Sequence, residues 1–79
     1  MKRRVYLTFP PSLVREAIVC EMYDRHHVRF NLRSASINDE IGIVGLELDG
    51  APAEIDAAMT FFRERGVTVE PIELDVVEP

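Results

Sequence analysis

The residues of this chain that are able to do chemistry gather around one stretch, Phe30-Asn31-Leu32, and three glycines that follow it, Gly42, Gly45 and Gly50. Asn31 is a polar side chain in an otherwise apolar strand pair, and glycine within a strand often marks the close approach of a ligand or of another backbone. The rest of the chain lacks the residue types and spacing that bond-making catalysis requires. We therefore expect a binding domain and not an enzyme.

Metal and cofactor chemistry is disfavoured by the histidines and the cysteine. His26 and His27 are adjacent, and neighbouring side chains point apart on a helix or a strand, while no second histidine or cysteine pair completes a ligand set. Cys20 is the only cysteine, which excludes an internal disulfide and a cysteine-ligated iron-sulfur cluster within one chain. We expect neither a metal nor a cofactor.

The charge balance and the length restrict the partners. With a formal net charge of -5 over 79 residues, the chain is a poor match for nucleic acid, and the basic start Lys2-Arg3-Arg4 is more typical of a solvated strand end. No segment has the apolar length of a membrane-spanning helix or of a signal peptide. We expect a cytoplasmic protein, and its small size favours association with a partner.

The elements that must position Asn31 follow from periodicity. A strand is predicted over about residues 3–9, and a helix from Ser12 to about Asp24 with its apolar residues at helical spacing. Two strands follow, over about residues 28–37 and 41–50, and Asn38-Asp39-Glu40 joins them as a hairpin.

The second half of the chain completes the pattern. Pro52 suits the first turn of a second helix that ends at Gly66, and a last strand runs from Val67 to about Leu74. The order βαββαβ predicts an α+β fold, a ferredoxin-like two-layer sandwich whose antiparallel sheet has the order 4-1-3-2. We expect residues 1–79 to form one such domain.

The hairpin register places the candidate site. If Ile37 faces Ile41, then Arg33 faces Gly45, and side chains two apart share a face. The even-numbered apolar residues, Phe30, Leu32, Leu46 and Leu48, are then expected in the core. The odd-numbered face is expected to be open, with an apolar patch that includes Ile37 and Ile41, and it holds the predicted ligand-binding residues Asn31, Arg33, Ala35, Ile43 and Gly45. Strand twist is the alternative, because it can roll the hairpin tip over the first helix and make this face ordinary core.

The stretches around these residues resemble the NIL domain, a ferredoxin-like module named for an Asn-Ile-Leu motif that appears here as Asn31-Leu32-Arg33. The likeness extends over nearly the whole chain and includes Leu7-Thr8-Phe9-Pro10, the glycine-spaced segment 42–50 and the closing segment 66–70. It implies a regulatory, methionine-sensing module like the one at the end of the ATPase subunit of bacterial methionine importers, where pairs of domains bind the amino acid between them.

Residue by residue, only Asn31 matches the ligand-proximal asparagine that the resemblance implies. Ala17 stands where the family usually has proline, and Arg33 replaces an apolar residue and adds a partner for a carboxylate. The leading hypothesis is a domain that forms a homodimer through its edge strands and binds methionine or a related amino acid near Asn31. The rival is an adaptor without a ligand of its own, and a third hypothesis is an accessory subunit in sulfur-amino-acid biosynthesis or transport.

Overall fold

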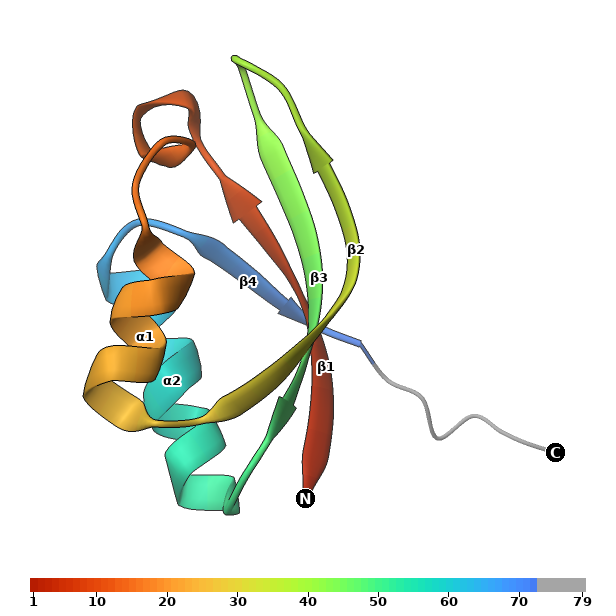
Figure 1. Cartoon of the computed structure of the whole chain (residues 1–79), viewed down its shortest axis with the longest axis vertical. Coiled ribbons are helices and arrows are strands. Elements are labelled where there is room, and N and C mark those ends of the chain that lie inside the picture. The colour runs from red at the N-terminus through yellow and green to blue at the C-terminus, as the bar shows by residue number, and fades with distance from the viewer. Residues whose placement is uncertain (73–79) are drawn as a thin grey trace, which may run out of the picture.

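The structure of the protein is a computed structural model, and it describes residues 1–72. Both helices lie on one side of an antiparallel sheet whose strand order is β2-β3-β1-β4 (Figure 1). This confirms the ferredoxin-like α+β fold and the predicted sheet order. The elements are β1 (Lys2–Phe9), α1 (Ile18–His26), β2 (Arg29–Ile37), β3 (Gly42–Asp49), α2 (Pro52–Glu64) and β4 (Thr68–Pro71). The predicted end of the last strand, at Leu74, lies outside the described residues.

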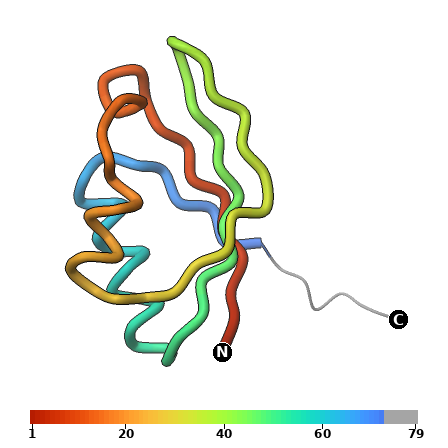
Figure 2. Tube along the Cα trace, viewed as in Figure 1, coloured from red at the N-terminus to blue at the C-terminus, as the bar shows by residue number. Residues whose placement is uncertain are grey.

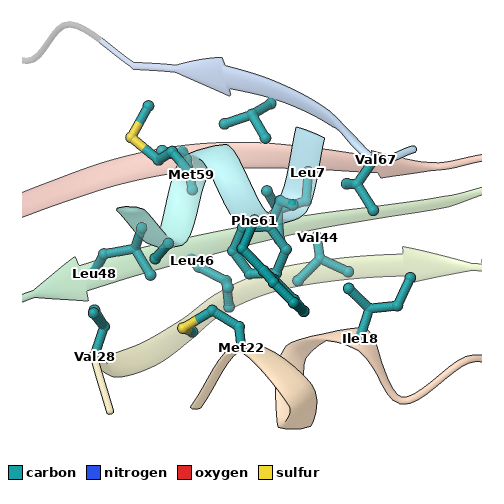
Figure 3. Close-up of a cluster of buried hydrophobic side chains, with 14 of the residues drawn as sticks. Leu7, Ile18, Met22, Val28, Val44, Leu46, Leu48, Met59, Phe61 and Val67 are labelled. Carbon is teal, nitrogen blue, oxygen red and sulfur yellow. The ribbon is translucent and has the colours of Figure 1, made fainter. Parts of the chain in front are cut away.

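β1 is one of the two central strands of the sheet and pairs with β3 on one side and with β4 on the other. Its residues alternate in burial, so that Val5, Leu7 and Phe9 face the helices. The apolar stripe of α2 packs on this layer, and Figure 3 shows Met59 and Phe61 of this helix gathered with Leu7, Leu46 and Leu48 of the strands. The core therefore lies between the two helices and strands β1, β3 and β4.

α2 has the limits that the sequence predicts. Pro52 begins the helix, where its missing N–H leaves no helical hydrogen bond unmade. The side chain of Glu54 accepts a hydrogen bond from the Ala51 amide at 3.0 Å, and this bond satisfies one of the amides at the helix start. Gly66 follows the helix with a φ of 97°, a conformation that glycine adopts without strain.

α1 begins six residues later than predicted, at Ile18 and not at Ser12. A 3₁₀ turn over Pro11–Leu13 occupies the expected first helical turn, and the side chain of Ser12 makes no capping hydrogen bond. Ala17 has φ -84° and ψ 54°, which are not helical values, so the helix starts only after it. None of the helices within residues 1–72 has the length and apolar character needed to cross a membrane.

β2 is an edge strand, and all of its side chains are exposed. The prediction that Phe30 and Leu32 belong to the core is wrong, because their exposed fractions are 40% and 60%, whereas Leu46 and Leu48 opposite them are buried. β2 lies at the edge of the sheet and has a neighbouring strand on one side only. The domain therefore presents apolar side chains along one edge of its sheet.

Candidate functional site

The β2–β3 pair contains one irregularity that decides where the candidate residues lie. From Arg29 to Leu32 the strands pair as predicted, with Asn31 opposite Glu47. Arg33 is then an extra residue, because Leu32 pairs with Leu46 while Ser34 pairs with Gly45. The trace of β2 steps sideways in its yellow part, about halfway along (Figure 2). This is a β-bulge, in which two residues of one strand face a single residue of the other.

The bulge changes the face of every residue that follows it. Ala35 pairs with Val44 and not with Ile43, and Ile37 pairs with Gly42 and not with Ile41. Because Val44 is buried on the helix side, Ala35 and Ile37 also lie on that side and not on the open face as predicted. The alternative prediction, that strand twist makes the hairpin tip ordinary core, holds only in part, because the side chain of Ile37 is 60% exposed.

Arg33 and Gly45 still meet, in a hollow of about 210 Å³ on the open face of the sheet. Ser34 lies directly opposite Gly45, and β1 contributes Arg4, Val5 and Tyr6 to the lining of the hollow. A Cβ atom built on Gly45 would lie 2.6 Å from the Ser34 hydroxyl oxygen and 3.2 Å from Cε1 of Tyr6. Glycine at this position therefore lets Ser34 and Tyr6 approach the backbone of β3.

Asn31 lines a second hollow beside the first, of about 230 Å³, together with Lys2, Arg29, Glu47 and Asp49. Glu47 lies between β2 and β1, opposite Asn31 on one side and Arg4 on the other. Its carboxylate forms a partly buried ion pair with Arg4, with 3.4 Å between Nε and Oε2. Asn31 and Arg33 are thus on the same face and close along β2, but they line adjacent hollows.

Ile43, the remaining predicted residue, lies on the open face near the hairpin tip, opposite Ser36 in β2 and Thr8 in β1. Its side chain is 40% exposed. Of the five predicted residues, Arg33 and Gly45 line one hollow, Asn31 lies next to it, Ile43 is further along the same face, and Ala35 is on the opposite face.

A third hollow, of about 170 Å³, is apolar and lies on the helix side. It opens between the start of α1 and the hairpin tip, and Ile37 is the residue of β2 that lines it. Cys20, whose thiol is free, is at its rim, and Glu16 is its one charged lining residue. The remaining lining residues are Phe9, Val14, Ala17, Ile18, Val19, Gly42 and Val44.

The electrostatics of the open face favour an anion at the bulge. Arg4 is paired with Glu47, whereas no carboxylate of residues 1–72 lies within ion-pair distance of Arg33. A guanidinium group presents planar, forked donors that match a carboxylate. The Ser34 hydroxyl beside it both donates and accepts hydrogen bonds. The arrangement suits a small molecule with a carboxylate, and within residues 1–72 no three histidine, cysteine or acidic side chains are placed to hold a metal ion.

Sequence reasoning missed Arg4, Tyr6 and Ser34 as lining residues of the hollow at the bulge. A signal for the first two is present, because β1 alternates strictly and its even-numbered residues must share the open face. Ser34 had no usable signal in a regular hairpin register, since only the bulge turns it toward Gly45.

Comparisons with known proteins agree on one family. A model of the NIL domain matches residues 3–71. The methionine import ATP-binding protein MetN 1 of Paraburkholderia xenovorans (strain LB400) is 38% identical over 77 residues, which cover 91% of this chain and 22% of that protein. The chain thus spans about a fifth of the length of this curated relative.

A solved structure has the same fold. The C-terminal domain of an ABC transporter ATP-binding protein from Enterococcus faecalis superposes with a TM-score of 0.79, and the match covers 89% of this chain and 82% of that one at 22% sequence identity. At this identity the likeness is evidence for the fold alone. Because the family model covers all but the ends of the chain, this protein belongs to the NIL domain family.

Proposed function

We propose that this protein is a non-catalytic regulatory domain that binds methionine or a related amino acid on the open face of β2 and β3, at an interface between two copies. The observation that carries the proposal is the 38% identity to a methionine import ATP-binding protein over 91% of this chain. It concerns only the fifth of that protein that this chain matches, and so it bears on this domain and not on ATP hydrolysis. Its association with a transporter belongs to the same proposal, and its cytoplasmic location stays a prediction.

The geometry supports a small amino acid as the ligand. Arg33 offers a partner for the α-carboxylate, and the Asn31 side chain offers both an amide donor and a carbonyl acceptor within the neighbouring hollow. Glu47 and Asp49 line the hollow of Asn31 and suit an α-ammonium group. A zwitterion therefore finds complementary charges along one short length of β2.

Each hollow is open to solvent in a single copy, and a ligand held there keeps much of its surface in water. Tight small-molecule sites bury most of the ligand. β2 is fully exposed at the sheet edge, next to both hollows. A second copy at this edge would close the site. The ligand would then bind the dimer more tightly than the monomer, and this difference in affinity would shift the equilibrium toward the dimer.

Calorimetric titration with L-methionine tests the proposal. We expect saturable binding to the wild type and roughly five- to thirtyfold weaker binding by Asn31→Ala, because one lost hydrogen bond in a closed site is worth about 1–2 kcal/mol. Asn38→Ala is the control, because it makes the same substitution outside the site. Asn38 lies in the hairpin turn, where its side chain accepts hydrogen bonds from the Glu40 and Ile41 amides. Equal affinity in the wild type and Asn31→Ala would remove Asn31 from the site, and no heat at millimolar methionine would contradict the function.

An adaptor without a ligand of its own is the second candidate. It is favoured by the large apolar side chains that are exposed along the hairpin, which are Phe30, Leu32, Ile37, Ile41 and Ile43. Such side chains in a small domain are typical of a protein interface. The two candidates differ in the titration, because an adaptor gives no signal with methionine or homocysteine but still buries these side chains against its partner.

A further inference from the structure

The start of β1 has a free edge on the side where β4 runs. β4 pairs with β1 no further than Val5, and one more hydrogen bond, of 2.9 Å, runs from the Ile72 amide to the Arg4 carbonyl. Backbone groups that point to the same side alternate along an antiparallel strand, so Lys2 presents its N–H and C=O to the same side as Arg4. Among residues 1–72 no strand pairs with Lys2 on this side. Such an unpaired edge can accept a further extended segment.

Arg3, in the same part of β1, has a guanidinium group without an acceptor. Its Nε is buried and makes no hydrogen bond, and within residues 1–72 no carboxylate lies within ion-pair distance of its side chain. Arg3 is one of the odd-numbered residues of β1, which face the helices, and it pairs with the buried Leu48 of β3. A donor that is removed from water and gains no acceptor destabilises the fold. The helix side of this edge therefore lacks one acceptor.

The register of β4 brings an acidic residue to this position. β4 advances by one residue for each residue back along β1, up to Pro71 opposite Val5. Continued in the same register, Glu73 lies opposite Arg3 and on the same face of the sheet. Hydrogen-bonded and non-hydrogen-bonded pairs alternate, and this pair is of the second kind, in which the two side chains are closest. Oppositely charged side chains at such positions attract each other across the strands.

The charges of the two segments are complementary beyond this one pair. Residues 73–79 contain no basic residue and three acidic ones, Glu73, Asp75 and Glu78. The basic residues at the start of β1 are Lys2, Arg3 and Arg4. Arg4 is already paired with Glu47 on the open face, so Lys2 and Arg3 are the cations available at the free edge.

We infer that residues 73–75 continue β4 along the free edge of β1, and that the carboxylate of Glu73 binds the guanidinium group of Arg3. The backbone of Leu74 then pairs with that of Lys2, which lines the hollow of Asn31. The interaction surface is thus a basic strand edge, and its occupant is an acidic segment of the same chain. The segment holds in place the end of β1 that forms one wall of this hollow, whatever ligand the hollow takes.

Amide hydrogen exchange followed by NMR, without any ligand, tests the backbone pairing. We expect the Lys2 amide to exchange about five- to tenfold more slowly in the wild type than in Leu74→Pro, because proline cannot donate to the Lys2 carbonyl and is excluded from a paired position. Val77→Pro is the matched control and should keep the wild-type rate, since residue 77 lies past the start of β1. Equal Lys2 rates in the wild type and Leu74→Pro overturn the inference.

Charge variants test the contact with Arg3 by the same measurement. Glu73→Gln should speed the exchange of the Lys2 amide by roughly three- to tenfold, because a hydrogen bond between charged groups is lost. Glu78→Gln removes the same charge from a position past the start of β1 and should leave the rate unchanged. In an Arg3→Met background, which keeps an apolar stem but no charge, Glu73→Gln should have no further effect, since the pair is already broken.

A general attraction between an acidic segment and a basic strand gives a different result. It predicts equal effects of Glu73→Gln and Glu78→Gln, and that outcome overturns the assigned register. An effect of Glu73→Gln that is the same with Arg3 and with Met at this position overturns the contact between Glu73 and Arg3. Because no ligand is present in these measurements, their outcome is independent of the titration with methionine.

Discussion

Gly45 shows how a single missing side chain sets the packing of the open face. Its backbone is approached by the Ser34 hydroxyl from β2, at a distance that a Cβ atom would not allow, and by the Tyr6 ring from β1, at a distance that would make a tight contact with a Cβ atom. The bulge brings Ser34 to this position, and the regular pairing of β1 brings Tyr6. Gly45 is therefore needed for the shape of the hollow, whether or not a ligand fills it.

We expect Gly45→Ala to lower the free energy of unfolding by about 1–2 kcal/mol, because Ser34 and Tyr6 must both shift to admit the methyl group. Urea denaturation measures this. Gly42→Ala is the matched control, since its Cβ would meet Ile37 at an ordinary 3.6 Å and should cost less. In the double variant with Ser34→Ala, the loss should be smaller than the sum of the single losses, and strict additivity would show that the Ser34 contact is not the cause.

At the scale of elements, α1 is shorter than its apolar pattern suggests because its start is set by the backbone at Ala17. Residues 12–17 keep some helical spacing, and Leu13 and Val14 pack against the core from a 3₁₀ helix and the turn that follows it. Two consecutive prolines and an uncapped Ser12 leave the first turn without a stable helical start. The hairpin tip stays uncovered as a result.

Ala17→Pro should stabilise the protein by about 0.4–1 kcal/mol. The φ of Ala17, -84°, is near the value that proline fixes, and the substitution restricts mainly the unfolded chain. Thermal unfolding followed by circular dichroism measures the change. Asp24→Pro, at an exposed position inside α1, is the contrast and should cost about 3 kcal/mol. A destabilised Ala17→Pro would mean that the Ala17 amide or the preceding Glu16 conformation matters to the start of α1.

The elements that regular alternation or helical spacing governs were predictable, and those that depend on an irregular backbone were not. β1, β3 and α2 lie within a residue or two of their predicted limits. The bulge did leave a trace in the sequence, because the apolar residues of β2 change from even numbers, Phe30 and Leu32, to odd numbers, Ala35 and Ile37. In a regular strand this change means two apolar faces, whereas with one extra residue it means a single face.

At the scale of the whole molecule, the apolar surface is divided between a core that a single copy buries and an edge that it does not. Leu46 and Leu48 are buried under the helices, while Phe30 and Leu32, directly opposite them, are exposed. Folding and association therefore depend on different residues of one hairpin. The candidate site lies at the boundary, on the strand that contributes little to the core.

Leu32→Ser should separate the two processes. At micromolar concentration, where monomers dominate, we expect its free energy of unfolding to change by less than about 0.5 kcal/mol, because the side chain is largely exposed. Leu46→Ala should cost about 2–5 kcal/mol by leaving a cavity. At high concentration with methionine, the wild type should gain thermal stability with concentration and Leu32→Ser should not, since only a dimer links stability to concentration. A large loss in the Leu32→Ser monomer would place Leu32 in the folding core after all.

Because of the bulge at Arg33, β2 is expected to tolerate the deletion of one residue, a change that disrupts most strands. Deleting a residue from a regular strand turns every later side chain to the opposite face. Deletion of Arg33 alone would leave Leu32 followed by Ser34, and the alternation from Arg29 to Ile37 would become regular with Ser34 still opposite Gly45. Related chains can therefore lack one residue at this position and keep the same hairpin. Such chains would have neither the positive charge of Arg33 nor the β-bulge.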